Sequence, residues 1–384
     1  MSSDVVIIGA GITGCAAAYE LARAGASVHV VDRRNIGTMG SGRTLAGVRQ
    51  SGRHRDELPL AIEAVRRWET LHLELDADLE YRQHGNLRLA EDESDTHVIS
   101  QMVQEHQNLG LDVRYLDGNA AVRDVAPALS ETIQAASFTP TDGHANPILT
   151  VQAYARAAQR LGVQFSLEQD VSRITTHNGK VAGVVTTQER ITADCVVVAA
   201  GIESPAILHT AELDLPISLS MVPVVQTVEI EPILDQVLGT AKAHFAARQE
   251  VDGKMRFSSG GRPISLSSDS IDHAAMQPGC TRLAETLSRA TKIIPRLEEV
   301  PVNQVWGGLV DLTTDGLPVL DRVDEPEGLV IAAGFCGHGF CLGPVTGEIV
   351  RDLVLGNETG FAMEPFRWGR LVTGEETTRA ELLG

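Results

Sequence analysis

The most regular hydrophobic pattern lies at the start of the chain. Residues 5–8 are a continuous run of valine and isoleucine, which is typical of a parallel strand buried on both faces. A glycine-rich turn follows at once, and residues 15–24 then predict a helix that ends at Gly25. Residues 27–31 predict a second strand, which ends at Asp32. The chain therefore opens with a predicted strand–turn–helix–strand unit.

The turn between this first strand and helix carries three glycines, Gly9, Gly11 and Gly14, at the spacing of a dinucleotide-binding motif. Gly9 makes the tight turn, Gly11 lets the backbone approach a pyrophosphate, and Gly14 lets the helix pack on the strand. The helix N-terminus offers free N–H groups to the phosphates, and Asp32 is placed to accept hydrogen bonds from an adenosine ribose. The motif alone does not separate FAD from NAD, but its position near residue 9 of a long chain favours FAD.

The remaining pattern alternates helices with short strands. Apolar residues at helical spacing predict helices over residues 60–75, 94–110, 148–161 and 282–294. Apolar runs predict strands over residues 87–90, 163–165, 171–175, 181–186, 194–201 and 305–309. Between residues 222 and 266, alternating apolar and polar stretches predict antiparallel strands.

A second glycine-rich turn follows a strand near the end of the chain. Residues 329–333 predict a buried strand, residues 334–340 form the turn, and a helix is predicted over residues 345–355 with Pro344 near its start. The N-terminus of this helix would face an electron-rich group. A flavin pyrimidine ring, which gains negative charge on reduction, is the natural candidate.

Composition and charge then restrict the class of protein. The 384 residues are 43% hydrophobic and 22% charged, which is typical of a globular protein of two domains, or of one with insertions. A net charge of −19 disfavours nucleic acid and anionic membranes as partners. Outside the glycine-bearing N-terminal run, no stretch offers some 20 apolar residues, so we expect no membrane span and a cytoplasmic protein. Five scattered cysteines predict neither a disulfide framework nor a metal site.

Together these segments resemble the D-amino-acid-oxidase type of FAD-dependent oxidoreductases, which includes glycine oxidase, sarcosine oxidases and dye-linked proline dehydrogenases. The resemblance runs from Asp4 to about Leu355. The segments that carry it are residues 5–32, 41–49, 194–201 and 315–347. Within this group, residues 41–50 and 81–88 look most like the FAD-carrying β subunits of heteromeric opine, proline and hydroxyproline dehydrogenases.

The resemblance implies a fold of mixed α/β and α+β class. A discontinuous, Rossmann-like FAD-binding domain carries an inserted antiparallel-sheet substrate domain, which covers the isoalloxazine ring. We assign residues 1–85, 142–218 and 312–384 to the FAD-binding domain and residues 86–141 and 219–311 to the substrate domain.

The expected FAD contacts combine the two glycine-rich turns with the segments between them. They are Gly9, Gly11, Ile12, Thr13, Gly14, Asp32, Arg33, Arg34, Ser41, Gly42, Arg43, Thr44, Val171, Ala200, Gly201, Gly334, Gly337, His338, Gly339 and Phe340. Some relatives attach FAD covalently through a cysteine, but that position falls near Gly307 and Gly308 here, so we expect non-covalent FAD.

The usual carboxylate anchors of the family are absent. Cys341 stands where relatives carry a lysine, and Asp311 ends a strand segment that carries an arginine in glycine oxidases. Arg49 is therefore a candidate substrate anchor, because a guanidinium binds a carboxylate through two hydrogen bonds, although a structural ion pair explains it equally well. Arg262 is a second candidate. His338 is a candidate acid–base group, although backbone N–H groups of its loop could perform that loop's function alone.

The resemblance implies oxidation of a C–N bond beside a carboxylate, with hydride transfer to flavin N5. The substrate would be an amino acid, or an N-substituted or cyclic amino acid of the opine, proline or hydroxyproline class. No lysine stands at residues 257–261, where oxidases place one to activate oxygen, which favours a dehydrogenase that passes electrons to a dye or to another subunit carrying a flavin or an iron–sulfur centre. The alternatives are an oxygen-using sarcosine- or glycine-type oxidase and a non-catalytic FAD-binding subunit.

Overall fold

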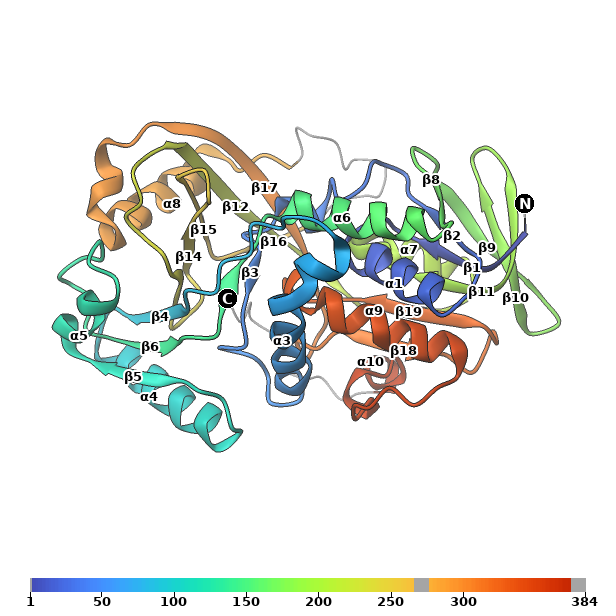
Figure 1. The fold of residues 1–384 in the computed structure, drawn as a ribbon, viewed down its shortest axis with the longest axis horizontal. Helices are drawn as coiled ribbons and strands as arrows, with labels where there is room; N and C mark the ends of the chain where they lie inside the picture. The colour runs from blue at the N-terminus through green and yellow to red at the C-terminus, as the bar shows by residue number, and fades with distance from the viewer. Residues whose placement is uncertain (1, 266–275, 374–384) are drawn as a thin grey trace.

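The structure is a computed structural model that describes residues 2–265 and 276–373. The end of the predicted antiparallel region at residue 266, and the last residues of the predicted FAD-binding domain from 374 onward, lie outside the described residues. Figure 1 shows the strands gathered in two sheets that lie side by side along the long axis of the molecule.

Eight of the described strands form the first sheet, which is centred on β1 (Ser2–Ile8). Its central parallel strands carry largely apolar, buried runs at residues 5–8, 28–31, 195–198 and 329–333, as the sequence pattern predicts. In spatial order from the C-terminal edge, the path is β18 (Val319–Arg322), β19 (Leu329–Ala333), β11 (Arg190–Val198), β1, β2 (Val28–Val31) and β8 (Gln164–Ser166). The hairpin of β9 (Val171–His177) and β10 (Lys180–Thr186) extends antiparallel from β11.

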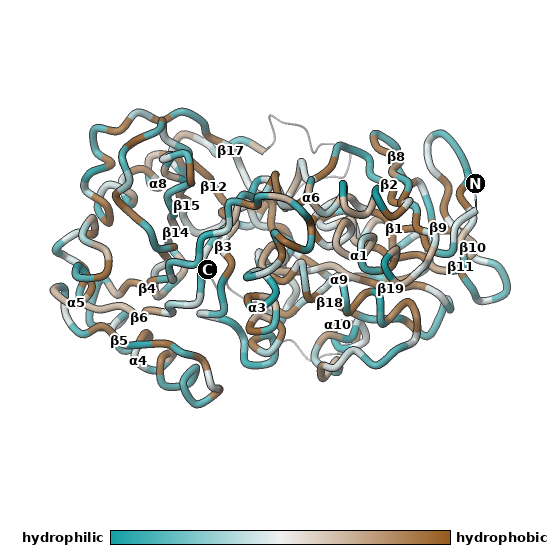
Figure 2. Tube along the Cα trace, viewed as in Figure 1, coloured by the Kyte–Doolittle hydropathy of each residue, from teal (hydrophilic) through white to brown (hydrophobic). Residues whose placement is uncertain are grey.

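Helices cover both faces of this sheet. One face carries α1 (Ile12–Arg23), α3 (Leu58–Leu75), α6 (Pro147–Arg160) and α9 (Gly339–Leu355), and the other carries α7 (Ser204–His209). The contact of α1 with α9 is close because a Cβ on Gly347 would lie 2.9 Å from the backbone of Ala16. Figure 2 shows hydrophobic segments gathered around β1 and α9, where this core lies.

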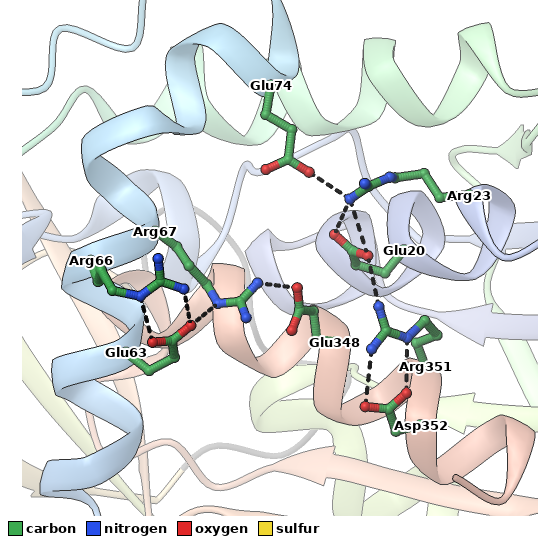
Figure 3. A network of polar contacts seen from close by, with 9 residues as sticks. All are labelled: Glu20, Arg23, Glu63, Arg66, Arg67, Glu74, Glu348, Arg351 and Asp352. Carbon is green, nitrogen blue, oxygen red and sulfur yellow. Dashed lines mark hydrogen bonds and ion pairs between the residues drawn. The ribbon is translucent and has the colours of Figure 1, made fainter. Parts of the chain in front are cut away.

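Charged side chains join α1, α3 and α9 on their outer surface (Figure 3). The pairs that link different helices are Arg23–Glu74, Arg351–Glu20 and Arg67–Glu348. Pairs of this kind, which remain partly exposed, each contribute at most about 1 kcal/mol to stability. The network therefore links the three helices but contributes little to the stability of the fold.

Nine of the described strands form the second sheet, which is mostly antiparallel. Its strands are β4 (Asn86–Ala90), β5 (Arg114–Asp117), β6 (Ala135–Thr139), β12 (Ser218–Glu229), β13 (Val237–Thr240), β14 (Phe245–Gln249), β15 (Lys254–Ser259), β16 (Arg262–Ile264) and β17 (Val302–Leu312). The helices α4 (Glu93–Asn108), α5 (Gly118–Val125) and α8 (Cys280–Ile293) lie against it. Its strands come from residues 86–139 and 218–312, while the domain limits themselves stay a prediction.

The start of α9 differs from the sequence-based expectation, and β5, α5 and β6 were not predicted. The helix predicted from residue 345 begins at Gly339, so Pro344 lies inside α9 rather than at its start. Proline there removes one backbone hydrogen bond in the second turn, a cost that the surrounding buried contacts outweigh. Between β2 and β3 (Gly47–Val48) the chain forms one helical turn, α2 (Gly40–Arg43), and β3 pairs with β7 (Gly143–His144). In the described part of the chain, no helix is long and apolar enough to cross a membrane.

Candidate functional site

A continuous cavity runs between the two sheets. Its lining includes the first glycine-rich turn, the second glycine-rich turn before α9, and residues from β13, β14 and β15 of the second sheet. Segments far apart in the chain therefore meet at one site.

The first glycine-rich turn adopts the conformation that a dinucleotide motif requires. Gly9 has a φ of 113°, and a Cβ on it would lie 2.3 Å from the carbonyl oxygen of Ala199. A Cβ on Gly14 would lie 1.9 Å from the oxygen of Gly9, so no side chain fits at either position. The backbone N–H of Ile12, at the start of α1, donates to Oγ of Ser41 at 2.9 Å. The helix N-terminus and Ser41 thus line the same part of the cavity.

Asp32 ends β2 and lines the cavity close to this turn. Its carboxylate accepts backbone hydrogen bonds from Ala10 at 2.6 Å and from Arg34 at 2.7 Å, one on each oxygen. Burial raises the pKa of Asp32. A carboxylate oxygen has two lone pairs, so each oxygen can accept one further hydrogen bond from a ribose hydroxyl. Close to Asp32, Nη1 of Arg33 donates a hydrogen bond to Oε1 of Glu203 at 2.7 Å, and Glu203 was not predicted from the sequence.

Most of the predicted FAD contacts line this cavity. Those that do are Gly9, Gly11, Ile12, Thr13, Asp32, Arg33, Arg34, Ser41, Arg43, Thr44, Val171, Ala200, Gly201, Gly337, His338, Gly339 and Phe340. The other three, Gly14, Gly42 and Gly334, are not among the lining residues, and each meets neighbouring atoms within 2.6 Å of a built Cβ. Their role in this structure is close backbone packing that shapes the turns.

Asp311 shapes the second glycine-rich turn. Its carboxylate accepts the backbone N–H of Gly334 at 2.9 Å, and its carbonyl oxygen accepts that of Cys336 at 3.0 Å. Asp311 lines the cavity, and burial raises the pKa of its carboxyl to about 6. In the sequence, Asp311 was noted only because relatives carry an arginine in this segment. In the structure, its two hydrogen bonds bind the backbone of the turn between β19 and α9.

Three arginines lie together at another part of the cavity, and we call them the arginine cluster: Arg49, Arg53 and Arg88. Nη1 of Arg49 donates to the carbonyl oxygen of Ser51 at 2.7 Å. Nε and Nη2 of Arg53 donate to the carbonyl oxygen of Arg49 at 3.2 Å. Arg88, on β4, is only 4% exposed. Of the three, Arg49 was expected from the sequence, whereas Arg53 and Arg88 were not.

The arginine cluster is strongly electropositive. Burial, followed by the charges of Arg53 and Arg88, lowers the pKa of Arg49 well below its ordinary value, and burial and Arg53 lower the pKa of Arg88 to about 10. The neighbouring acids are Glu57 and Asp142. Among the described residues, Nη1 of Arg53 and both Nε and Nη2 of Arg88 have no hydrogen-bond partner. Buried donors of this kind favour an anionic ligand.

His338 lies at the same end of the cavity and pairs with Glu57. Nδ1 of His338 is 2.8 Å from Oε2 of Glu57, and both side chains are buried. Burial lowers the pKa of His338. Burial alone would raise the pKa of Glu57, but His338 and Arg53 lower it, so Glu57 is ionised and accepts the Nδ1 proton. The pair therefore makes Nε2 the basic nitrogen of a neutral histidine.

Arg262 does not join Arg49 and His338. Its side chain is 62% exposed, pairs with Glu285 at 3.2 Å, and is absent from the residues that line the cavity. The neighbouring residues Gly260 and Gly261 do line it, so the segment is close but its arginine points elsewhere. No described lining residue is a lysine. The described residues also contain no group of histidine, cysteine and acidic side chains that could hold a metal ion.

Comparisons with known proteins cover nearly the whole chain. A family model described as FAD dependent oxidoreductase matches residues 4–353. The sarcosine oxidase subunit beta of Rhizobium meliloti (strain 1021) is 26% identical over 378 residues, which are 97% of this chain and 89% of the relative. The glycine oxidase of Bacillus licheniformis is 27% identical over 92% of this chain and 93% of its own. The crystal structure of L-proline dehydrogenase from P. horikoshii matches with a TM-score of 0.90 and 27% identity over 97% of this chain and 99% of that chain.

Proposed function

The chain belongs to the FAD-dependent oxidoreductase family, and on this premise we propose that it oxidises the C–N bond of an amino acid or of an N-substituted or cyclic amino acid. The family, the mixed α/β fold, the enzyme class and the FAD dependence expected from the sequence are confirmed. The substrate, the site roles and the electron acceptor belong to the proposal. The observation that carries it is one cavity that joins a dinucleotide-binding turn to the arginine cluster and to His338.

The residues of the cavity fit FAD. The backbone of the first glycine-rich turn and Ser41 suit a pyrophosphate, and Asp32 has hydrogen-bonding capacity for a ribose. The N-terminus of α9, next to Gly337 and Gly339, offers a positive dipole end to the flavin ring. When bound, FAD supplies the acceptor for the hydride, which carries both electrons away from the C–N carbon. The glycine pair Gly307 and Gly308 provides no side chain for covalent attachment, so the proposal includes non-covalent FAD.

The substrate end requires an anion anchor and a base. We assign the substrate carboxylate to Arg49, whose planar guanidinium suits a carboxylate better than a point charge does. His338, with its proton on Nδ1 held by Glu57, takes a proton from the substrate ammonium through Nε2. The amine must be neutral before its carbon can release a hydride. Glu57 acts through His338 and is a positioning residue.

An anaerobic reduction experiment tests this assignment. Anaerobic mixing of amino acids with the purified holoenzyme should bleach the flavin absorbance. Arg49→Lys should keep the flavin spectrum but lower kcat/KM by about a hundredfold, since the two-point contact with the substrate carboxylate is lost. Arg55→Lys is the matched control, because Arg55 lies in the same loop with a side chain that is 71% exposed.

Unchanged kinetics of Arg49→Lys would return Arg49 to a structural role. A holoenzyme that no amino acid bleaches would favour a non-catalytic FAD-binding subunit.

We further propose that the electrons pass to another subunit rather than to oxygen. Two observations support this: the described lining of the cavity contains no lysine, and several relatives are named as subunits. A partner carrying a flavin or an iron–sulfur centre is the expected acceptor. Expressed alone, the chain should turn over slowly with oxygen and regain activity on co-expression with that partner. Stoichiometric hydrogen peroxide at full speed from the isolated chain would favour an oxidase instead.

A further inference from the structure

We propose that the substrate is a dicarboxylic amine, whose second carboxylate binds to Arg88. This inference rests on the proposed function and deepens it, because Arg49 and its role as the first anchor come from there. A monocarboxylic substrate would use only one of the two guanidinium groups.

The guanidinium of Arg88 is buried in the wall of the cavity. It is 4% exposed, lines the cavity from β4, and forms neither an ion pair nor a hydrogen bond through Nε or Nη2 in the described part of the chain. Nε–H and Nη2–H point in the same direction in an arginine side chain, and together they form an edge that binds both oxygens of one carboxylate. An arginine buried without such a partner costs several kcal/mol, so the unpaired edge indicates an absent anionic ligand.

Gly52 packs against the guanidinium of Arg88, whose Nε and Nη2 are both buried. A Cβ on Gly52 would lie 2.3 Å from Cζ, 2.4 Å from Nη2 and 2.6 Å from Nε of Arg88. Because Cζ is the nearest of the three atoms, Gly52 covers the flat face of the guanidinium and not its outer edge. Glycine is required here to let the backbone approach so closely, and its φ of 66° is in the left-handed region as well.

Two acids, Glu57 and Asp142, lie near the arginine cluster. Glu57 is engaged with His338 at 2.8 Å and lies 3.7 Å from Arg53. The other neighbouring acid, Asp142, accepts the backbone N–H groups of Gln50 at 2.7 Å and Ser51 at 3.2 Å. Burial raises the pKa of Asp142. The charge of Asp142 raises the pKa of Arg88, but among the described residues no acid bonds directly to Nε or Nη2 of Arg88, and a second carboxylate on the substrate would do so.

Two arrangements of the second carboxylate share this chemistry. It can sit on the second substituent of the nitrogen, as in iminodiacetate, or on the side chain of the amino acid, as in aspartate. Flavin reduction by iminodiacetate and by aspartate, each compared with sarcosine, distinguishes the two arrangements.

The binding test uses two ethers that have no C–N bond to oxidise. Oxydiacetate carries two carboxylates and methoxyacetate carries one, and each is titrated into the holoenzyme at constant ionic strength while the flavin absorbance and the Tm are recorded. We expect oxydiacetate to bind about ten- to a hundredfold more tightly than methoxyacetate. Arg88→Met should abolish this preference, because the contact to the second carboxylate is lost.

The matched control is Arg114→Met, which removes the same charge from the same sheet at a side chain that is 61% exposed. It should keep the preference for oxydiacetate. Equal Kd values for the two ethers in the wild type would overturn the inference, and so would a preference that survives in Arg88→Met. If Arg88→Met does not retain FAD, the wild-type comparison decides. A protein that prefers oxydiacetate but is reduced by no amine would reject the proposed function while supporting the second anion site.

Discussion

The buried carboxyl of Asp311 should make the stability of this protein depend on pH in an unusual direction. Its pKa is raised by burial from 3.8 to about 6, a difference of roughly 2 units, which corresponds to about 3 kcal/mol at 1.36 kcal/mol per unit. The folded protein holds this proton more tightly than the unfolded chain does. The stabilisation is therefore complete below about pH 4 and is lost as the pH rises through about 6.

Asp311→Asn removes the charge and keeps an oxygen that can accept the backbone N–H of Gly334. We expect this variant to unfold at a higher urea concentration than the wild type at pH 7.5, with a gain of up to about 3 kcal/mol in the free energy of unfolding, and to lose most of that gain by about pH 4. Tryptophan fluorescence at four pH values between these limits, with equal FAD saturation, measures the difference.

Asp315→Asn is a control of opposite sign. Burial alone would raise the pKa of Asp315, but its ion pair with Arg370 at 2.7 Å lowers it, so its stabilisation is present at neutral pH and is lost on acidification. This variant should be less stable than the wild type at pH 7.5 and should approach it at low pH. An Asp311→Asn curve that runs parallel to the wild type across the whole range would refute the reasoning.

Two further predictions concern the cofactor. Asp32→Ala should weaken FAD retention by about ten- to a hundredfold, because charge-assisted hydrogen bonds contribute about 1.5–3 kcal/mol; full flavin content after extensive dilution and gel filtration would contradict the role given to Asp32. Acid precipitation of the protein should leave the yellow colour in the supernatant, since glycine occupies the covalent attachment position; colour that stays with the pellet would show a covalent bond.

The parts of the site that depend on local sequence could be predicted, and the first glycine-rich turn is the clearest case. Gly9, Gly14 and Asp32 lie within one short unit, and the close approach of backbone atoms explains why glycine is needed there. The buried strands around β1 were recognisable for the same reason, because a parallel strand covered on both faces is apolar throughout. Helix limits were less accurate at α9, where Pro344 suggested a start that tertiary packing overrides.

The substrate end of the cavity could not be predicted from the sequence, because its residues come from distant parts of the chain and meet only in the folded protein. Glu57 and His338 are 281 residues apart, and Glu57 in sequence resembles any acid that precedes a helix. Arg88 occupies an ordinary position in a short strand, and only burial without a partner marks it. Arg262 shows the opposite case, since its place after two glycines suggested the site while its side chain points to solvent and to Glu285.

The joining of α1 to α9 also has a consequence for biosynthesis. The backbone N–H of Arg49 contacts Sγ of Cys341, a separation of 292 residues, so the cavity is complete only when the chain has been synthesised through Cys341. At roughly 5–20 residues per second, the ribosome needs on the order of 15–60 s to cover that distance. During this time the apolar face of α1 that later meets Gly343 and Gly347 has no partner. FAD insertion is therefore expected only after α9 has emerged from the ribosome, and nascent chains should depend until then on chaperones that cover that face.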